Sequence, residues 1–185
     1  SNLSGFHLRN NPNFYPRVIR YWDGQEIEAL IFEGGGARAL VYCGVVQCLE
    51  DKQLLSNIKC FSGTSSGAQM ASLLSFGYKS SEIKEIFRLS PWDDILDRSF
   101  NFNTFKDIYQ LTHEYGLYSG HKLEQFYDSL FEKKIGFSNC TFSQLHYKNK
   151  IHLRIGVCNV NTQDFVYLDY KHQSLNEFYF YNEVD

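Results

Sequence analysis

The hydrophobic pattern of the first half of the chain predicts two strand–helix units, each joined by a glycine-rich turn. Residues 27–32 and 58–61 are short apolar runs of strand length, whereas residues 37–50 repeat their apolar positions at a helical period. Residues 67–75 are small and apolar, which is typical of a buried helix. The glycines at 34–36 fit neither regular structure, so they mark the first turn.

The second half of the chain continues the alternation of helices and strands. Helices are predicted over residues 79–89 and 119–131, and strands over residues 152–160 and 163–170. Ser80 or Ser81 is expected to cap the first of these helices. Strands that alternate with helices favour a three-layer α/β/α fold with a mostly parallel central sheet.

Composition and charge indicate one globular domain with no affinity for nucleic acid. The 185 residues are 43% hydrophobic, enough for a proper core, and no linker divides residues 26–185. Residues 1–25 are polar, contain two prolines and read as an irregular leader. The net charge of -3 comes without a basic stripe, which excludes a typical nucleic-acid binder.

Neither a membrane span nor a metal site is predicted. The longest apolar run, residues 39–46, is far shorter than the roughly 18 residues of a spanning helix. The five cysteines contain no C-x-x-C pair, so buried free thiols in a reducing compartment are expected. The six histidines lack ligand spacing and no calcium-loop pattern is present. No cofactor is predicted.

The sequence GTSSG, residues 63–67, follows the second predicted strand and precedes a helix. It fits the pattern G-x-S-x-G in one register only, which places Ser65 at its centre between Gly63, Thr64 and Gly67. Such a turn forces the central residue into strained geometry and needs small flanking residues. Ser65 is therefore the predicted nucleophile, although the short pattern alone also fits a plain strand-to-helix turn.

The upstream glycine loop occupies the corresponding place in the first strand–helix unit. A dinucleotide loop would have glycine where Ala39 stands, and a phosphate-binding loop would end in Gly-Lys-Ser/Thr, which is missing. An oxyanion hole fits better, because adjacent strand-to-helix turns of a parallel sheet open on the same edge. The amides of the loop and Ser65 are expected to face one crevice.

These paired motifs resemble the patatin-like phospholipases, a family of lipid acyl hydrolases. The resemblance rests on GGGAR (34–38) and GTSSGA (63–68), and continues through GYKSSEIKEIF (77–87) and GLYSGHKLEQFYDSLF (116–131). It ends with TFSQL (141–145) and GVCNVNTQDFVYL (156–168), so it covers most of the chain from about residue 27.

The resemblance implies a serine hydrolase that acts on phospholipid acyl esters through a Ser–Asp dyad. An aspartate would activate Ser65, which would form an acyl-enzyme that water later hydrolyses. The residues expected at the oxyanion hole are Gly34, Gly35, Gly36, Ala37, Arg38 and Ser66. Arg38 could fix the loop or favour an anionic headgroup, or it could only pair with a surface carboxylate.

Two positions depart from the family pattern. Ala39 stands where the family usually has glycine, which is a mild change. The dyad aspartate of the family lies in an Asp-Gly-Gly or Asp-Gly-Ala motif, and the only Asp-Gly here, at residue 23, is too early in the chain. Asp164 and Asp169 are poor candidates, so the dyad aspartate is expected beyond Asp185, in a fold that is incomplete at its C-terminus.

Three other functions remain open from the sequence. An α/β-hydrolase with a Ser–Asp–His triad could use one of the downstream histidines, but it would build more strands before its nucleophile. An acyl-carrier transferase shares the elbow, yet its histidine and arginine partners cannot be placed. A catalytically inactive interaction module would explain the missing aspartate but gives no physical reason to keep Ser65 and three glycines.

The expected free thiols favour a cytoplasmic protein, and a soluble chain that acts on lipids must meet a phospholipid surface transiently. Phe100, Phe102 and Phe105 could form an interfacial patch, although aromatic residues more often lie in the core. Residues 92–111 are the candidate lid. The sequence names no protein activator.

Overall fold

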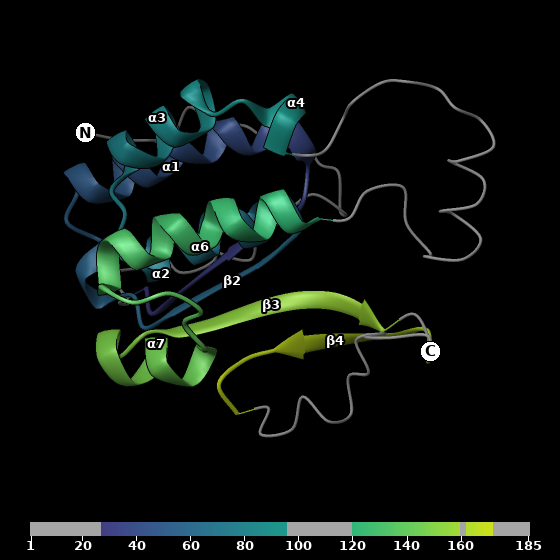
Figure 1. The fold of residues 1–185 in the computed structure, drawn as a ribbon. Helices are drawn as coiled ribbons and strands as arrows, with labels where there is room; N and C mark the ends of the chain where they lie inside the picture. The colour runs from purple at the N-terminus through teal and green to yellow at the C-terminus, as the bar shows by residue number, and fades with distance from the viewer. Residues whose placement is uncertain (1–26, 96–119, 160–161, 172–185) are drawn as a thin grey trace, which may run out of the picture.

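A four-stranded sheet organises the computed structural model, which describes residues 27–95, 120–159 and 162–171 (Figure 1). Its strands are β1 (Ala29–Phe32), β2 (Cys60–Thr64), β3 (His152–Asn159) and β4 (Asp164–Leu168), in the order β1-β2-β3-β4. The first three strands are parallel, and β4 returns antiparallel to β3. The sheet is therefore mostly parallel, as the alternating pattern predicts.

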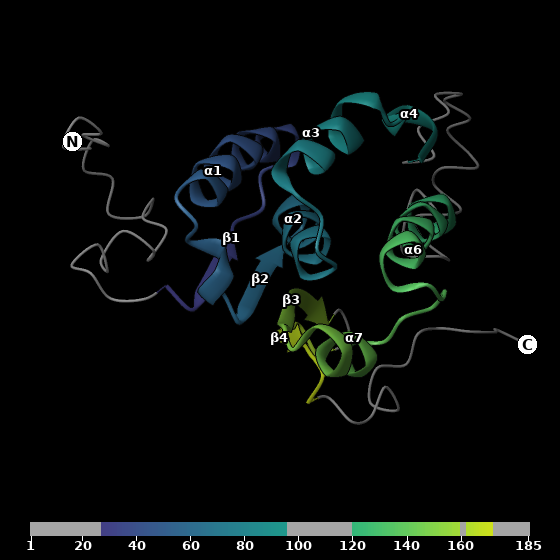
Figure 2. The same ribbon diagram turned by 90° about the vertical axis from the view of Figure 1, so that its left-hand side faces the viewer.

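Helices connect and flank these strands. They are α1 (Leu40–Asp51), α2 (Ser66–Ser75), α3 (Ser80–Leu89), α4 (Trp92–Ile95), α6 (His121–Ile135) and α7 (Phe142–Asn149), with short 3-10 turns η2 (Gly36–Ala39) and η3 (Leu55–Asn57). Helix α2 lies against the three parallel strands, while α1 packs on α3 (Figure 2). This arrangement follows from the right-handed crossovers that join parallel strands.

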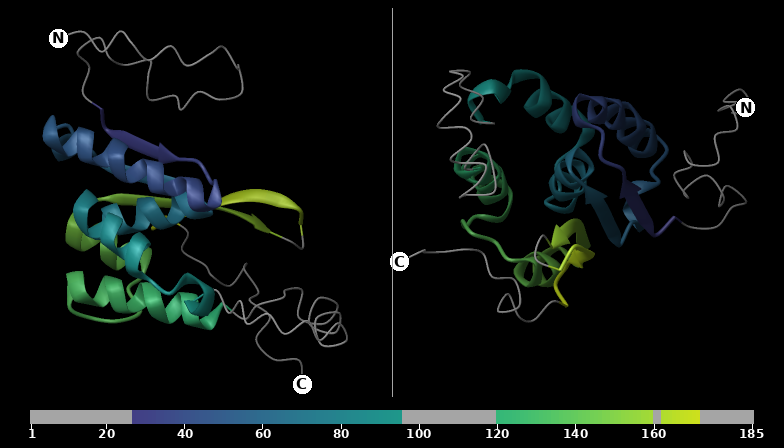
Figure 3. Two further views of the ribbon diagram at one scale, coloured as in Figure 1. Left: turned by 90° about the horizontal axis from the view of Figure 1, so that it is seen from above. Right: turned by 90° about the vertical axis from the view of Figure 1, so that its right-hand side faces the viewer.

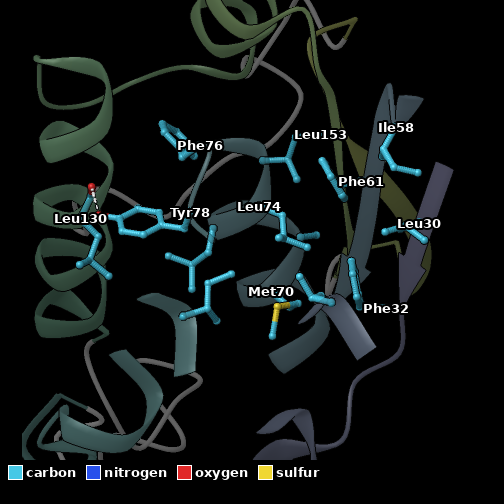
Figure 4. Packing of buried hydrophobic residues seen from close by; sticks show 14 of the residues in the cluster. Leu30, Phe32, Ile58, Phe61, Met70, Leu74, Phe76, Tyr78, Leu130 and Leu153 are labelled. Carbon is cyan, nitrogen blue, oxygen red and sulfur yellow. Dashed lines mark hydrogen bonds between the residues drawn. The ribbon is translucent and has the colours of Figure 1, made fainter. Parts of the chain in front are cut away.

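The core lies between the sheet and α2. Leu30, Phe32, Phe61 and Leu153 point from the strands toward Met70 and Leu74 (Figure 4). Those strand positions alternate with more exposed ones, the period of two that a sheet imposes. Burial of this apolar surface fixes α2, and with it the turn before α2, to the strand ends.

The opposite side of the sheet is more exposed in the described part of the chain. Ile31 is 59% exposed, and on β4 the side chains of Phe165 and Tyr167 are 57% and 38% exposed. The strand register places all three on the face that also carries Ser62 and Arg154.

The second strand differs from its predicted bounds. It begins at Cys60 rather than at residue 58, and it continues through Gly63 to Thr64. The reason is pairing with both neighbours, since Gly63 is the partner of Phe32 and Thr64 that of Gly156. A glycine that looks like a turn residue in the sequence is here part of the ladder.

The N-cap predicted for α3 is wrong. Lys79 occupies that position, and its backbone N–H donates to Glu82 Oε2 over 2.8 Å. The Ser80 N–H donates instead to Glu50 Oε1 over 2.9 Å, and the Ser80 hydroxyl also donates to Glu50. Ser80 therefore ties α3 to the end of α1, a tertiary contact that local cap rules do not contain.

Helix α7 has no counterpart in the sequence prediction, although its signal was present. Thr141 and Gln144 form a capping box, in which the Gln144 N–H donates to Thr141 Oγ1 over 3.2 Å and the Thr141 N–H donates to Gln144 Oε1 over 2.9 Å. The predicted lid begins with the helical turn α4, and its residues 96–111 lie outside the described residues, as do the leader and Phe100, Phe102 and Phe105.

All five cysteines are free thiols, as predicted, but only Cys43 is buried. Cys48 and Cys158 are exposed, so the expectation of buried thiols is wrong for them. Apolar neighbours in the sequence do not ensure burial, because α1 and β3, which carry these two cysteines, each have exposed positions.

Leu73→Ala should lower the free energy of unfolding by about 2–5 kcal/mol, because Leu73 is fully buried in α2 and its truncation leaves a cavity. Leu89→Ala is the matched control, since Leu89 is 66% exposed and should cost less than about 1 kcal/mol. Urea denaturation followed by circular dichroism measures both. Equal losses would contradict the packing of α2.

Candidate active site

Ser65 occupies the turn between β2 and α2 in a strained backbone conformation. Its φ of 54° and ψ of -126° lie in a region that a residue with a side chain rarely adopts. The side chain is exposed, whereas Ser66 and Gly67 beside it are buried. An exposed serine on a strained strand-to-helix turn is the geometry of a nucleophile elbow.

The two glycines of the motif are required by close backbone contacts. A Cβ atom on Gly63 would lie 2.2 Å from the carbonyl oxygen of Gly67. A Cβ atom on Gly67 would lie 2.3 Å from the carbonyl oxygen of Phe32. The spacing G-x-S-x-G therefore lets the first turn of α2 approach β2 and the end of β1 at once, and this approach holds Ser65 in its strained conformation.

The glycine loop after β1 contacts this elbow, although Gly34 and Ser65 are 31 positions apart in the sequence. A Cβ atom on Gly34 would lie 3.0 Å from Ser65 Cβ and 3.1 Å from the Thr64 carbonyl oxygen. The Gly35 N–H donates a hydrogen bond of 3.0 Å to Ser66 Oγ. The structure thus brings both glycine turns to one edge of the sheet, next to Ser65.

The rest of the loop is exposed. Gly36 has a positive φ of 57°, and the Arg38 N–H donates to the Gly35 carbonyl over 3.2 Å. In residues 27–95, 120–159 and 162–171, no carboxylate lies within ion-pair distance of the Arg38 side chain. The alternative expected for Arg38, pairing with a surface carboxylate, therefore finds no partner among the described residues.

Two side chains that support the loop were missed in the sequence. The Tyr42 hydroxyl donates to the Glu33 carbonyl over 2.8 Å, and its ring packs edge-on against Phe32 at 5.2 Å. Burial, with the nearby Glu33 carboxylate, raises the pKa of Tyr42, so the phenol stays a donor. The second is the hydroxyl of Ser66, a residue for which the sequence predicts a role only through its backbone N–H. No local pattern signals either contact.

The aspartates of β4 lie away from Ser65. Asp169 follows β4 beside Arg154, whose partner in β2 is Ser62, three residues before Ser65. It is buried and contacts His152 Nε2 at 3.2 Å. Among the described residues, no carboxylate hydrogen-bonds the Ser65 hydroxyl. Asp164, which pairs with Asn159 at the far end of the hairpin, is exposed.

Other candidate sites are weaker within the described residues. A cavity lined by Glu50, Tyr78 and Asn149 reaches Ile58 and Phe61, at the opposite end of β2 from Ser65. No group of three or more His, Cys, Asp or Glu side chains is arranged there to hold a metal ion. None of the described helices combines the length and the apolar composition needed to cross a membrane.

Comparison with known proteins gives matches in both sequence and structure. A family model for patatin-like phospholipases matches residues 30–174. Protein R571 of Acanthamoeba polyphaga mimivirus, described as uncharacterized, is 33% identical over 139 residues, which are 75% of this chain and 44% of R571. Uncharacterized protein YqhO of Bacillus subtilis is 29% identical over 56% of this chain and 36% of YqhO.

The fold is similar to that of ExoU from the type III secretion system of Pseudomonas aeruginosa, solved in complex with SpcU. The TM-score is 0.59 and the identity 19%, over 80% of this chain and 35% of the solved chain. This likeness confirms the predicted α/β fold with a mostly parallel sheet flanked by helices. The chain thus spans less than half the length of the relatives it matches.

The family match begins one residue inside β1 and runs past the end of β4, so it contains the glycine loop, the elbow and nearly all of the described sheet. It covers well over half of the chain. The protein belongs to the patatin-like phospholipase family.

Proposed function

We propose that this protein is a serine lipid acyl hydrolase of the phospholipase A type. The observation that carries the proposal is the strained, exposed Ser65, with Gly34 packed against its Cβ atom at the edge of the sheet. Family membership supports a lipase-type function in general. The nucleophile, the dyad and the phospholipid ester substrate are the finer statements proposed here.

In the proposed reaction, Ser65 Oγ attacks the carbonyl carbon of an acyl ester and gives its proton to the dyad aspartate. The tetrahedral intermediate then expels the alcohol, which takes that proton, and leaves an acyl-enzyme that water hydrolyses. Backbone N–H groups would stabilise the negative oxygen that forms in the intermediate. The start of α2 adds its positive dipole end at the same place.

The candidate oxyanion donors differ in whether their N–H groups already donate a hydrogen bond in the structure. The Gly35 N–H already donates to Ser66 Oγ, so its first role is to fix the loop. We assign oxyanion binding to the Ser66 N–H and to the amides of Gly34, Gly36 and Ala37. The Arg38 N–H already donates to the Gly35 carbonyl, so Arg38 acts instead through its side chain, turned to an anionic headgroup. Contact with a phospholipid surface follows from this substrate and would be peripheral.

Ser65→Ala should abolish the release of fatty acid from phospholipid vesicles by the full-length protein, because it removes the atom that forms the acyl-enzyme. We expect a loss of at least about a thousandfold in kcat. Ser81→Ala, an exposed serine at the start of α3, is the matched control and should keep wild-type activity. Fatty acid release by the Ser65 variant at the wild-type rate would exclude the mechanism, and an inactive wild-type protein would favour the interaction module.

Gly34→Ala should lower kcat by about ten- to a hundredfold with a smaller change in KM, because the added methyl group presses on Ser65 and Thr64 and shifts the reacting groups. Gly44→Ala makes the same change in the interior of α1, where the new Cβ atom meets nothing within 4 Å. That control should keep full activity and raise the stability by about 0.5–1 kcal/mol. Similar kinetics for the two variants would disprove the role of the Gly34 contact.

Ser66→Ala should reduce kcat by about three- to tenfold, since it removes the acceptor of the Gly35 N–H but keeps the Ser66 N–H itself. Ser75→Ala, in the same helix, removes a hydroxyl that donates only to the Ala71 carbonyl and should leave kcat unchanged. Steady-state hydrolysis of a soluble ester measures both. A fully active Ser66 variant would show that the loop needs no support from this hydroxyl.

A further inference from the structure

The β3–β4 hairpin extends beyond the elbow. The last paired residue of β2 is Thr64, opposite Gly156, and β3 continues for three more residues to Asn159. At about 3.3 Å per residue, the hairpin projects roughly 10 Å past the end of β2. The left view of Figure 3 shows it reaching beyond the end of β1. The hairpin therefore stands beside the edge of the sheet that carries Ser65.

Phe165 on this hairpin reaches back to the elbow. A Cβ atom on Gly156 would lie 2.6 Å from Phe165 Cζ and 2.9 Å from Thr64 Oγ1. The ring tip and the hydroxyl thus lie side by side above Gly156, which has no side chain to separate them. An aromatic ring from β4 is in this way brought next to the residue that precedes the nucleophile.

A row of contacts holds this ring in place. The rings of Phe165 and Tyr167 pack edge-on with centroids 4.9 Å apart, and the Arg154 guanidinium lies 4.5 Å from the centroid of the Tyr167 ring. Arg154 Nε in turn lies 3.5 Å from the carboxylate of Asp169, which is buried. The two rings are therefore supported from the sheet, although 57% of Phe165 is exposed.

We propose that Phe165 and Tyr167 form the surface that binds the fatty acyl chain of the substrate. This rests on the proposed function, since it places the acyl chain along the hairpin when its ester carbon is at Ser65. The two rings offer an exposed aromatic surface next to Thr64, because the tip of the Phe165 ring and the Thr64 hydroxyl both lie over Gly156. Burying methylene groups against such rings stabilises binding in proportion to the buried area.

The dependence of binding and activity on acyl-chain length distinguishes acyl-chain binding by the two rings from a general structural role. A butanoyl group has few methylene groups to place beyond the ester, whereas a dodecanoyl group would cover both rings. Loss of the rings should therefore affect long-chain ligands and leave short-chain ligands unchanged. We expect the effect in KM and in the Kd of the fatty acid product, with little change in kcat.

The test compares Phe165→Ala, Tyr167→Ala and Phe165→Leu with wild-type full-length protein. The control is Tyr147→Ala, which removes an 80% exposed tyrosine on α7. Isothermal titration calorimetry with dodecanoate needs no turnover, and Phe165→Ala should weaken this binding about tenfold, the contribution of one to two methylene groups. In ester assays, kcat/KM for p-nitrophenyl dodecanoate should fall about as much, with the butanoate ester within twofold, while Phe165→Leu keeps most of the binding.

Several results would overturn the proposal. One is that the wild type binds no dodecanoate, and another is that Phe165→Ala binds dodecanoate as well as the wild type does. A third is that kcat/KM falls equally for the dodecanoate and butanoate esters. A fourth is that Phe165→Ala lowers the Tm without changing the dependence of kcat/KM on acyl-chain length, which would make Phe165 a core residue. Weaker dodecanoate binding in Phe165→Ala, with no ester hydrolysis by the wild type, would uphold this surface and reject the proposed hydrolase. Normal ester hydrolysis by Phe165→Ala, with an unchanged dependence on acyl-chain length, would uphold the proposed hydrolase and reject this surface.

Discussion

The site depends on one close approach between backbones, that of Gly67 to the end of β1. The Phe32 carbonyl oxygen occupies the space that a Cβ atom on Gly67 would need, so α2 can begin only where β1 ends. Because Phe32 pairs with Gly63 across the parallel ladder, the turns that follow β1 and β2 leave the sheet at the same height. The contact of Gly34 with Ser65, and the strain at Ser65, follow from this approach.

The strain at Ser65 must be offset by the rest of the fold, and α2 supplies most of the compensation. A non-glycine residue in such a conformation costs on the order of 1–3 kcal/mol. Helix α2 buries Met70, Leu73 and Leu74 against the strands, and each of these side chains contributes stability of similar size. The core therefore does more than stabilise the chain, since it prevents the elbow from relaxing into an ordinary turn.

The sequence was informative where structure is set locally and uninformative where partners come from far away. Periodicity placed β1, α1 and α2 within a few residues, and the glycine spacing identified the turn that carries Ser65. The bond from Gly35 to Ser66, the support of Glu33 by Tyr42 and the tie of Ser80 to Glu50 were not foreseen, because each joins separate elements. The catalytic roles of Ser65 and the loop, and the position of the dyad aspartate, stay predictions.

Two separate parts of the described chain contribute to the proposed site. The strained turn and its amides come from the continuous unit β1–α1–β2–α2, in which the close approaches at Gly63 and Gly67 are to backbone atoms and leave no room for a Cβ atom. The proposed acyl-chain surface, formed by Phe165 and Tyr167, comes from β4, and the Phe165 side chain lies near the Thr64 hydroxyl over Gly156. Neither Asp164 nor Asp169 hydrogen-bonds Ser65 among the described residues, so the proposed dyad would need a carboxylate from elsewhere in the protein to come within about 3 Å of Oγ. If the proposals hold, a substitution in the hairpin would alter which acyl chain fits without disturbing Ser65, whereas a substitution in the glycine turns would disturb Ser65 itself.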